Sequence, residues 1–342
     1  MINYNNPDSN IISSNSNILD AIKLLDNVKI KLILIVDDKN LFIGTITDGD
    51  IRRSLIKSND LNLLCKDIMN DKPIYIYEDN KENLEAQLNK YKLPIPLINI
   101  DSKIISICTI SDQTHDAHNN IVVIMAGGRG QRLMPLTSSI PKPLLPINKK
   151  PIIHRIIDNN KKYGFRNIFI SINYKGDQLI DYFNNGKDFG VNISYLKEDR
   201  PLGTAGALSL LEHDKVTEPI ILINGDVLTN VNLSQLLEFH LNTGKDITMC
   251  AANYNVAVPY GTIDIKGTIV TNIIEKPLKS YLVNAGIYVI NPIIIKGMIP
   301  NEKIDMTSLL NQYVSDKNVS IYPLHENWID IGSHEDYKNA QK

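Results

Sequence analysis

Short apolar segments alternate with amphipathic ones over the last two thirds of the chain. The strand candidates are 121–125, 168–172, 193–196 and 220–223. Their length and abrupt polar or glycine borders are typical of buried strands. Between them, 152–163 and 178–183 have the spacing of helices that bury one face. This alternation predicts an α/β fold with a doubly wound, mostly parallel sheet, in which ligands bind at the carboxyl ends of the strands.

The first third of the chain contains an internal repeat, in which 33–50 aligns with 95–112. Each half has a helical stretch (18–26 and 81–91), then two strands joined by a polar turn, and then a Thr-x-x-Asp or Ser-x-x-Asp type ending. Repeats of this kind are usually paired units that bury a face against each other. The predicted domains are 1–116, with repeats over about 1–58 and 63–116, and 120–342, joined by a polar linker over 113–120.

Composition narrows the class of protein. The formal net charge of −2 over 342 residues gives no general basic field for nucleic acid. Three widely spaced cysteines, Cys65, Cys108 and Cys250, indicate reduced structural thiols rather than a metal or redox site. No apolar run approaches the roughly 18 residues that a membrane span requires. We therefore expect a cytoplasmic protein that binds neither nucleic acid nor membrane.

The candidate phosphate-binding segment follows directly on the first of these strands. It contains three glycines, Gly127, Gly128 and Gly130, and three cations, Arg129, Arg132 and Lys142. Glycines allow backbone N–H groups to converge on an anion, and the cations add positive charge. Residues 131–133 are Gln-Arg-Leu, which excludes both a P-loop and the dinucleotide fingerprint. A polyphosphate is the simplest ligand.

This segment resembles the signature of the sugar-1-phosphate nucleotidyltransferases, G-G-x-G-x-R-L-x-P-L-T followed by P-K-P. The resemblance implies a Rossmann-like domain that transfers a nucleoside monophosphate from an NTP to a sugar 1-phosphate and releases pyrophosphate. It implies Arg132, Lys142 and Asp226 as catalytic residues. The implied nucleotide-binding residues are Ala126, Gly127, Gly128, Gly130, Arg132, Glu198, Gly203, Thr204 and Ala205.

Two aspartates are candidates for metal binding. Asp226 ends the apolar strand at 220–223, and Asp330 lies in a Trp-x-Asp-x-Gly sequence. Two carboxylates together with substrate phosphates make the oxygen-rich site that Mg²⁺ prefers, although a lone strand-end Asp is often only a turn former. The resemblance implies that Asp226 and Asp330 hold Mg²⁺.

Further residues are expected to determine the selectivity for the sugar and for the nucleobase. The resemblance implies a sugar-phosphate set of Gly261, Glu275, Lys276 and Asn284. The Glu198 carboxylate could accept both adjacent donors of guanine, which favours GTP; alternatively, Glu198 forms an exposed ion pair with Arg200. A likeness to glucosamine-1-phosphate guanylyltransferases implies glucosamine 1-phosphate as the sugar. The alternatives are a mannose-1-phosphate guanylyltransferase, a uridylyl- or thymidylyltransferase, and more distantly a nucleotide-sugar-dependent glycosyltransferase or a non-catalytic nucleotide sensor.

The N-terminal repeat resembles a CBS-domain pair, an α+β module that often binds adenine nucleotides. The resemblance implies a regulatory nucleotide site of Thr47, Asp50, Thr109 and Asp112. The two aspartates could instead cap the helices that follow them. Since CBS pairs commonly associate, we expect a homo-oligomer. Taken together, the two halves resemble the CBS-bearing glucosamine-1-phosphate guanylyltransferases of GDP-legionaminate synthesis.

Overall fold

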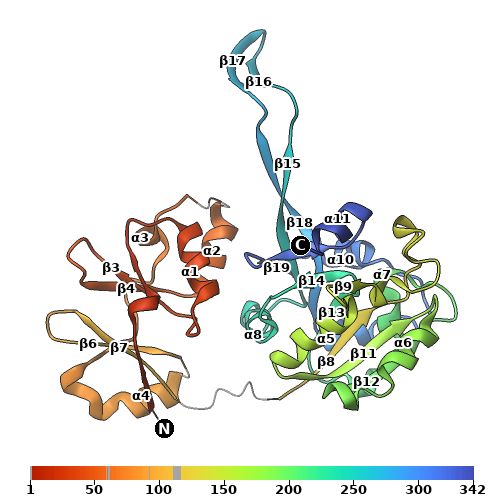
Figure 1. Ribbon diagram of the computed structural model, residues 1–342, viewed down its shortest axis with the longest axis horizontal. Helices are drawn as coiled ribbons and strands as arrows, with labels where there is room; N and C mark the ends of the chain where they lie inside the picture. Colours follow the sequence, from red (N-terminus) through yellow and green to blue (C-terminus); the bar gives the residue numbers. More distant parts are fainter. Residues whose placement is uncertain (1, 59, 61, 92, 111–116) are drawn as a thin grey trace. The chain divides into compact units, whose positions relative to one another are not determined.

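The computed structural model describes residues 2–58, 60, 62–91, 93–110 and 117–342. Its internal contacts divide the chain into two units, Met1–Thr114 and His115–Lys342, which Figure 1 draws in red to orange and in yellow to blue. Each unit is considered by itself. None of the helices in the described ranges is both long and apolar enough to cross a membrane.

The first unit contains two sheets of similar plan. One has the order β2 (Ile11–Ser13), β3 (Ile33–Val36), β4 (Phe42–Ile46), and the other has the order β1 (Ile2–Asn5), β7 (Ile104–Ile110), β6 (Ile95–Ile98), β5 (Ile76–Tyr77). Each sheet contains an antiparallel hairpin, β3–β4 or β6–β7, with a parallel strand beside it. The helices are α1 (Ile18–Asn27), α2 (Asp48–Ser58), α3 (Cys65–Ile68) and α4 (Leu84–Tyr91). The helix predicted over 81–91 therefore begins at Leu84, since residues 78–83 form a 3-10 segment with non-helical backbone at Asn80.

The second unit is built on a seven-stranded sheet. Its order is β12 (Asn192–Lys197), β11 (Phe165–Ile172), β8 (His118–Met125), β13 (Ile220–Asn224), β18 (Leu278–Ile290), β15 (Ile247–Ala257), β19 (Val319–Pro323). Every neighbouring pair is parallel except those that involve β18. Strand β8 begins at His118, so residues 118–120 belong to the sheet and not to the predicted linker; the Asn120 side chain donates to Pro219 O at 2.7 Å.

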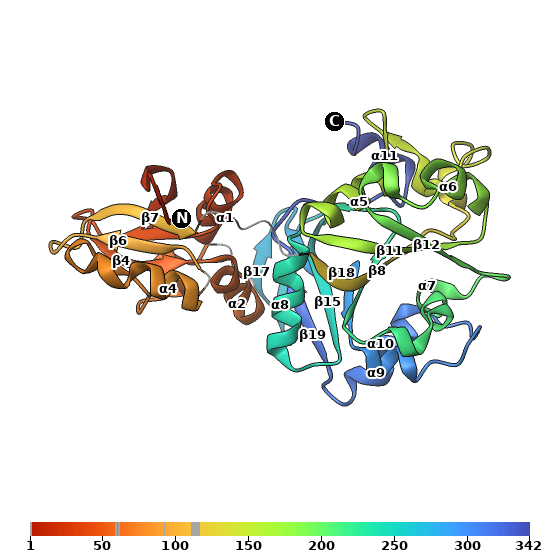
Figure 2. The ribbon, with the colours of Figure 1, turned by 90° about the horizontal axis from the view of Figure 1, so that it is seen from below.

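Helices cover both faces of this sheet (Figure 2). They are α5 (Ile152–Lys162), α6 (Gly176–Phe183), α7 (Gly203–Gly206), α8 (Leu233–Thr243), α9 (Pro292–Lys296), α10 (Met306–Val314) and α11 (His334–Asn339). Successive residues of β8 alternate between two cores, with Val122 and Ile124 facing α5, α6 and α8, and Val123 facing α9 and α10. Burial on both faces explains why this strand is continuously apolar in sequence.

Strands β15 and β18 continue beyond the sheet as a two-stranded ribbon. They pair without interruption from Ala251–Asn284 to Ala257–Leu278. A separate hairpin of β16 (Thr262–Lys266) and β17 (Ile269–Ile274) follows. Figure 1 shows ribbon and hairpin projecting away from the body of the unit. We call residues 253–282 the arm.

Candidate active site

The glycine loop leaves β8 at the carboxyl edge of the sheet. Two of its glycines are required by the chain itself. A Cβ at Gly127 would lie 3.0 Å from Glu198 Oε1, and one at Gly130, whose φ is +59°, would lie 2.9 Å from Thr137 Cγ2. At Gly128 the space is open, with no atom within 4 Å of an added Cβ. Gly128 leaves open space, Gly130 takes a backbone conformation that favours glycine, and Gly127 allows close packing on Glu198; phosphate binding by this loop stays a prediction.

A short antiparallel pair brings the two predicted metal ligands together. Strand β14 (Val227–Thr229) pairs with β20 (Trp328–Asp330), with Val227 opposite Asp330. The N–H of Ile331 donates to Asp226 O at 3.0 Å. Glycine is needed just before Asp226, because a Cβ at Gly225 would lie 2.5 Å from Met125 O. Asp226 and Asp330, about a hundred positions apart in sequence, are thus brought together by the pairing of β14 with β20.

Both predicted cations reach this carboxylate pair. Lys142, which is buried, donates from Nζ to Asp226 Oδ2 at 2.5 Å. The Arg132 guanidinium lies against Gly332, where an added Cβ would be 3.3 Å from its Nη1. Desolvation and the Asp226 charge raise the pKa of Asp330, while Lys142 and Arg132 oppose that rise. Two carboxylates that repel each other, with a single lysine bonded to one of them, are suited to a divalent cation.

Glu198 is buried and held by the chain. Its carboxylate accepts hydrogen bonds from the Ser171 hydroxyl and from the Leu202 N–H, the latter at 2.9 Å. Arg200 donates instead to Asn301 O at 3.1 Å. The alternative of an exposed Glu198–Arg200 ion pair is therefore wrong. A carboxylate offers about four lone-pair sites, so Glu198 could still accept hydrogen bonds from guanine, and this role stays a prediction. The sequence did not indicate Ser171 as a partner of Glu198.

The loop after Glu198 docks onto residues 302–306 of the same unit. Gly203 has φ +83°, and its added Cβ would lie 2.7 Å from Ile304 O. The N–H groups of Ala205 and Gly206 both donate to Ile304 O at 3.0 Å, and Thr204 Oγ1 accepts from Met306 N at 2.8 Å. Gly203 and Gly206 thus allow close contact with the chain's own segment, and nucleotide binding by Gly203, Thr204 and Ala205 stays a prediction.

The predicted sugar-phosphate set is divided between two places. Asn284 lies at the sheet, where its Oδ1 accepts from Tyr288 Oη at 2.8 Å, two residues from Gly286, which packs on Asn224. Gly261 and Glu275 lie together on the arm, since an added Cβ at Gly261 would be 2.8 Å from Glu275 Oε2. Sugar-phosphate binding by Gly261, Glu275, Lys276 and Asn284 stays a prediction.

In the first unit, the predicted nucleotide residues contact each other or neighbouring strands. The Asp50 carboxylate accepts from the Thr47 N–H at 2.8 Å and from its hydroxyl at 2.6 Å, which is the geometry of a helix cap. Thr109 Oγ1 accepts from Asn5 Nδ2 at 3.1 Å. Asp112 lies outside the described residues. Helix capping therefore accounts for Asp50, and adenine nucleotide binding stays a prediction.

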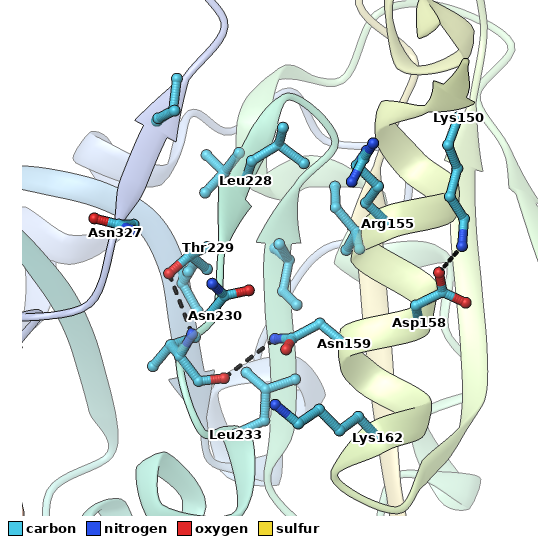
Figure 3. Close-up of a pocket in the computed structure, with 16 residues that line it drawn as sticks. Lys150, Arg155, Asp158, Asn159, Lys162, Leu228, Thr229, Asn230, Leu233 and Asn327 are labelled. Atoms are coloured by element: carbon cyan, nitrogen blue, oxygen red, sulfur yellow. Dashed lines mark hydrogen bonds and ion pairs between the residues drawn. The ribbon is translucent and has the colours of Figure 1, made fainter. Parts of the chain in front are cut away.

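A cavity of about 380 Å³ lies between α5, β14 and the start of α8 (Figure 3). Its polar lining includes Lys150, Arg155, Asp158, Asn159, Lys162, Thr229 and Asn230. Lys150 forms an ion pair with Asp158, and Asn159 donates to Val231 O at 3.1 Å. None of the described residues predicted to bind nucleotide or sugar lines this cavity, although it borders β14 and β20 next to both aspartates.

Known proteins resemble each unit separately. Residues 121–342 match the nucleotidyl transferase family and residues 4–57 match the CBS domain. The first match covers more than half of the chain, so the chain belongs to the nucleotidyl transferase family, with a CBS domain at its N-terminal end.

Its relatives within that family include guanylyltransferases. Mannose-1-phosphate guanyltransferase 2 of Candida glabrata is 33% identical over 225 residues, which are 63% of this chain and 62% of the relative. D-glycero-alpha-D-manno-heptose 1-phosphate guanylyltransferase of Aneurinibacillus thermoaerophilus is 32% identical over 64% of this chain and 96% of its own length. The crystal structure of HddC from Yersinia pseudotuberculosis complexed with GMP-PN superposes with a TM-score of 0.51 at 27% identity, covering 65% of this chain and 98% of HddC. The chain spans about three fifths of the length of the mannose-1-phosphate guanyltransferases that it matches.

Proposed function

We propose that this protein transfers a guanylyl group from GTP to a sugar 1-phosphate and releases pyrophosphate. The observation that carries the proposal is the meeting of Arg132, Lys142, Asp226 and Asp330 beside the glycine loop at the carboxyl edge of the sheet. Anionic ligands bind at this edge of α/β sheets. The guanylyltransferase relatives support the choice of base.

The proposed reaction is an attack by a phosphate oxygen of the sugar 1-phosphate on the α-phosphorus of GTP. The bond from that phosphorus to the bridging oxygen breaks, and pyrophosphate leaves. No covalent nucleophile on the protein is needed. Arg132 and Lys142 hold the triphosphate and neutralise charge, and positioning contributes much of the rate. Mg²⁺ held by Asp226 and Asp330 would supply further charge stabilisation when bound.

Two sugars have specific support. Glucosamine 1-phosphate is favoured by the resemblance to CBS-bearing guanylyltransferases, and a manno-configured sugar 1-phosphate is favoured by the names of the relatives reported above. A matrix of GTP, UTP, dTTP and ATP against glucosamine, mannose, glucose and manno-heptose 1-phosphates tests the proposal. Pyrophosphate release with GTP and one of these sugars is the expected result. If no combination of nucleotide and sugar 1-phosphate releases pyrophosphate, the proposed function is contradicted. Preference for UTP or dTTP would contradict the choice of base.

Glu198→Gln is expected to lower kcat/KM for GTP by about 10- to 100-fold, the scale of one charge-assisted hydrogen-bond pair. The buried position adds a complication, because the amide nitrogen of glutamine replaces one of the two carboxylate oxygens and cannot accept the bond, from Ser171 or from Leu202, that this oxygen accepts. Ser171→Ala is the matched control, since it removes one of these bonds and keeps the carboxylate. If Glu198 reads guanine, only the glutamate variant should reduce the preference for GTP over the other nucleotides. An equal loss with all nucleotides in both variants would assign Glu198 a purely structural role.

A further inference from the structure

The backbone that carries the two predicted catalytic cations is irregular. It runs from Arg132 through residues 134–146, which we call the proline segment and which contain Lys142. The prolines of this segment lack an N–H and interrupt any helix or ladder; they are Pro135, Pro141, Pro143 and Pro146. Hydrogen bonds within the segment close single turns, such as the bond from Leu145 N to Lys142 O at 3.0 Å. The path of the segment therefore depends on donors from other elements.

Three side chains near the end of the chain supply such donors. His334 Nε2 lies 2.8 Å from Met134 O, at the start of the proline segment, and because a carbonyl oxygen only accepts, the imidazole is the donor. At the other end of the segment, Pro146 O accepts from Tyr337 Oη at 2.7 Å and from Gln341 Nε2 at 2.9 Å. Residues 334–341, which we call the clamp and which include helix α11, thus hold both ends of the proline segment.

The clamp is also continuous with the carboxylate pair. Two residues separate Asp330 from Ser333, the N-cap of α11. One of these two, Ile331, is fully buried, and its N–H donates to Asp226 O at 3.0 Å. One short stretch therefore fixes the carboxylate pair and, through the side chains of the clamp, the segment that carries Lys142.

The direct bond between Lys142 and Asp226 cannot maintain this arrangement during the proposed reaction. If Lys142 holds the triphosphate while Asp226 binds a divalent cation, their contact at 2.5 Å is exchanged for contacts with the ligands. A contact that persists during substrate binding has to come from outside the site. The bonds of the clamp meet this condition, because their acceptors are backbone carbonyls, which do not bind phosphate.

We propose that the clamp positions Arg132 and Lys142 against the carboxylate pair. Its positioning residues are the three side-chain donors, His334, Tyr337 and Gln341. The proposal rests on the proposed function for its effect on catalysis, and on the hydrogen bonds to Met134 and Pro146 for the clamp itself. A misplacement of about 1 Å at an active site can cost about 100-fold in rate, so loss of the clamp should be visible in kcat.

A full-length variant with His334→Ala, Tyr337→Phe and Gln341→Met tests the proposal, because it lacks all three donors. For GTP and the sugar 1-phosphate that supports activity, kcat is expected to fall by about 10- to 100-fold. In the same background, glutamine in place of alanine at His334 should recover part of kcat, because its amide nitrogen reaches about as far as Nε2 and can donate. A triple variant with kcat close to that of the wild type would overturn the proposal.

The matched control is Tyr195→Phe. Tyr195 Oη donates to Asn184 O at 2.7 Å, which is the same type of bond at the same distance as that between Tyr337 and Pro146, but outside the clamp. This control should keep the kcat of the wild type. A fall in kcat as large as that of the triple variant would show that losing such a bond anywhere disturbs the enzyme, and it would overturn the specific role of the clamp.

Hydrogen exchange tests the clamp without any substrate. The N–H groups of Leu136, Leu144 and Leu145 close turns of the proline segment, and in the triple variant they should exchange at least about 10-fold faster than in the wild type. Tyr195→Phe should leave their exchange unchanged. Unchanged exchange in the triple variant would overturn the clamp even if activity is lost. A wild type that is inactive with every substrate pair would instead refute the proposed function and the catalytic role of the clamp, while faster exchange in the triple variant would still support the clamp itself.

Discussion

Asp226→Asn and Asp330→Asn should each lower turnover by at least about 100-fold, because each change removes one of the two negative charges that hold the divalent cation while keeping nearly the same volume. The measurement is steady-state pyrophosphate release over a range of Mg²⁺ concentrations. Asp158→Asn is the matched control: it also removes a carboxylate from an ion pair, with Lys150, and it should leave turnover close to that of the wild type. Near-normal activity of both site variants at limiting Mg²⁺ would contradict the assignment.

Asp330→Asn should also change the stability of the metal-free protein. Burial and the Asp226 charge raise the pKa of Asp330 in the folded protein. Ionised Asp330 therefore costs stability at pH values above that raised pKa, and the cost is relieved as the pH falls through it. Asp330→Asn should raise the Tm of the metal-free protein slightly at neutral pH and abolish its increase on addition of Mg²⁺. A lower Tm in this variant would show that Asp330 contributes to the fold through other contacts.

The sheet could be predicted because its strands are buried on both faces. Four short strand candidates correspond to β8, β11, β12 and β13, and the mostly parallel order follows from the helices between them. The start of β8 could not be predicted, since His118 and Asn119 are polar and enter the strand only through pairing with β11. The arm was missed for the same reason: tertiary pairing, not local pattern, sets how far β15 and β18 extend.

The site could be predicted only in part. Membership of the nucleotidyl transferase family is confirmed, but no local rule predicts that β14 and β20 pair and bring Asp226 beside Asp330. Nor does spacing show that both oxygens of Glu198 are already bonded within the protein. Glu275 and Asn284 lie close together in sequence, but residues 278–284 form an extended ribbon that separates them in space. Sequence spacing alone does not predict this separation.

Lys142→Met is expected to combine a large loss of activity with a loss of stability. Lys142 Nζ lies 2.5 Å from Asp226 Oδ2 in a largely enclosed position, so without metal it is the direct counter-charge of the carboxylate pair. Its removal should lower kcat/KM for GTP by at least about 100-fold through lost neutralisation of the triphosphate. It should also destabilise the metal-free protein by about 1–2 kcal/mol, because Asp226 keeps its charge and loses its partner.

Added Mg²⁺ distinguishes these two roles of Lys142. A cation bound by Asp226 and Asp330 replaces the missing ammonium charge, so Mg²⁺ should raise the Tm of Lys142→Met more than that of the wild type. Stability should return while activity does not. Lys150→Met, which breaks the exposed pair with Asp158, is the matched control and should change neither property strongly. Adding Asp226→Asn to Lys142→Met should restore part of the metal-free stability, because the uncompensated charge is then gone. If the double variant is no more stable than Lys142→Met, Lys142 supports the fold by packing, and its charge is not what balances Asp226.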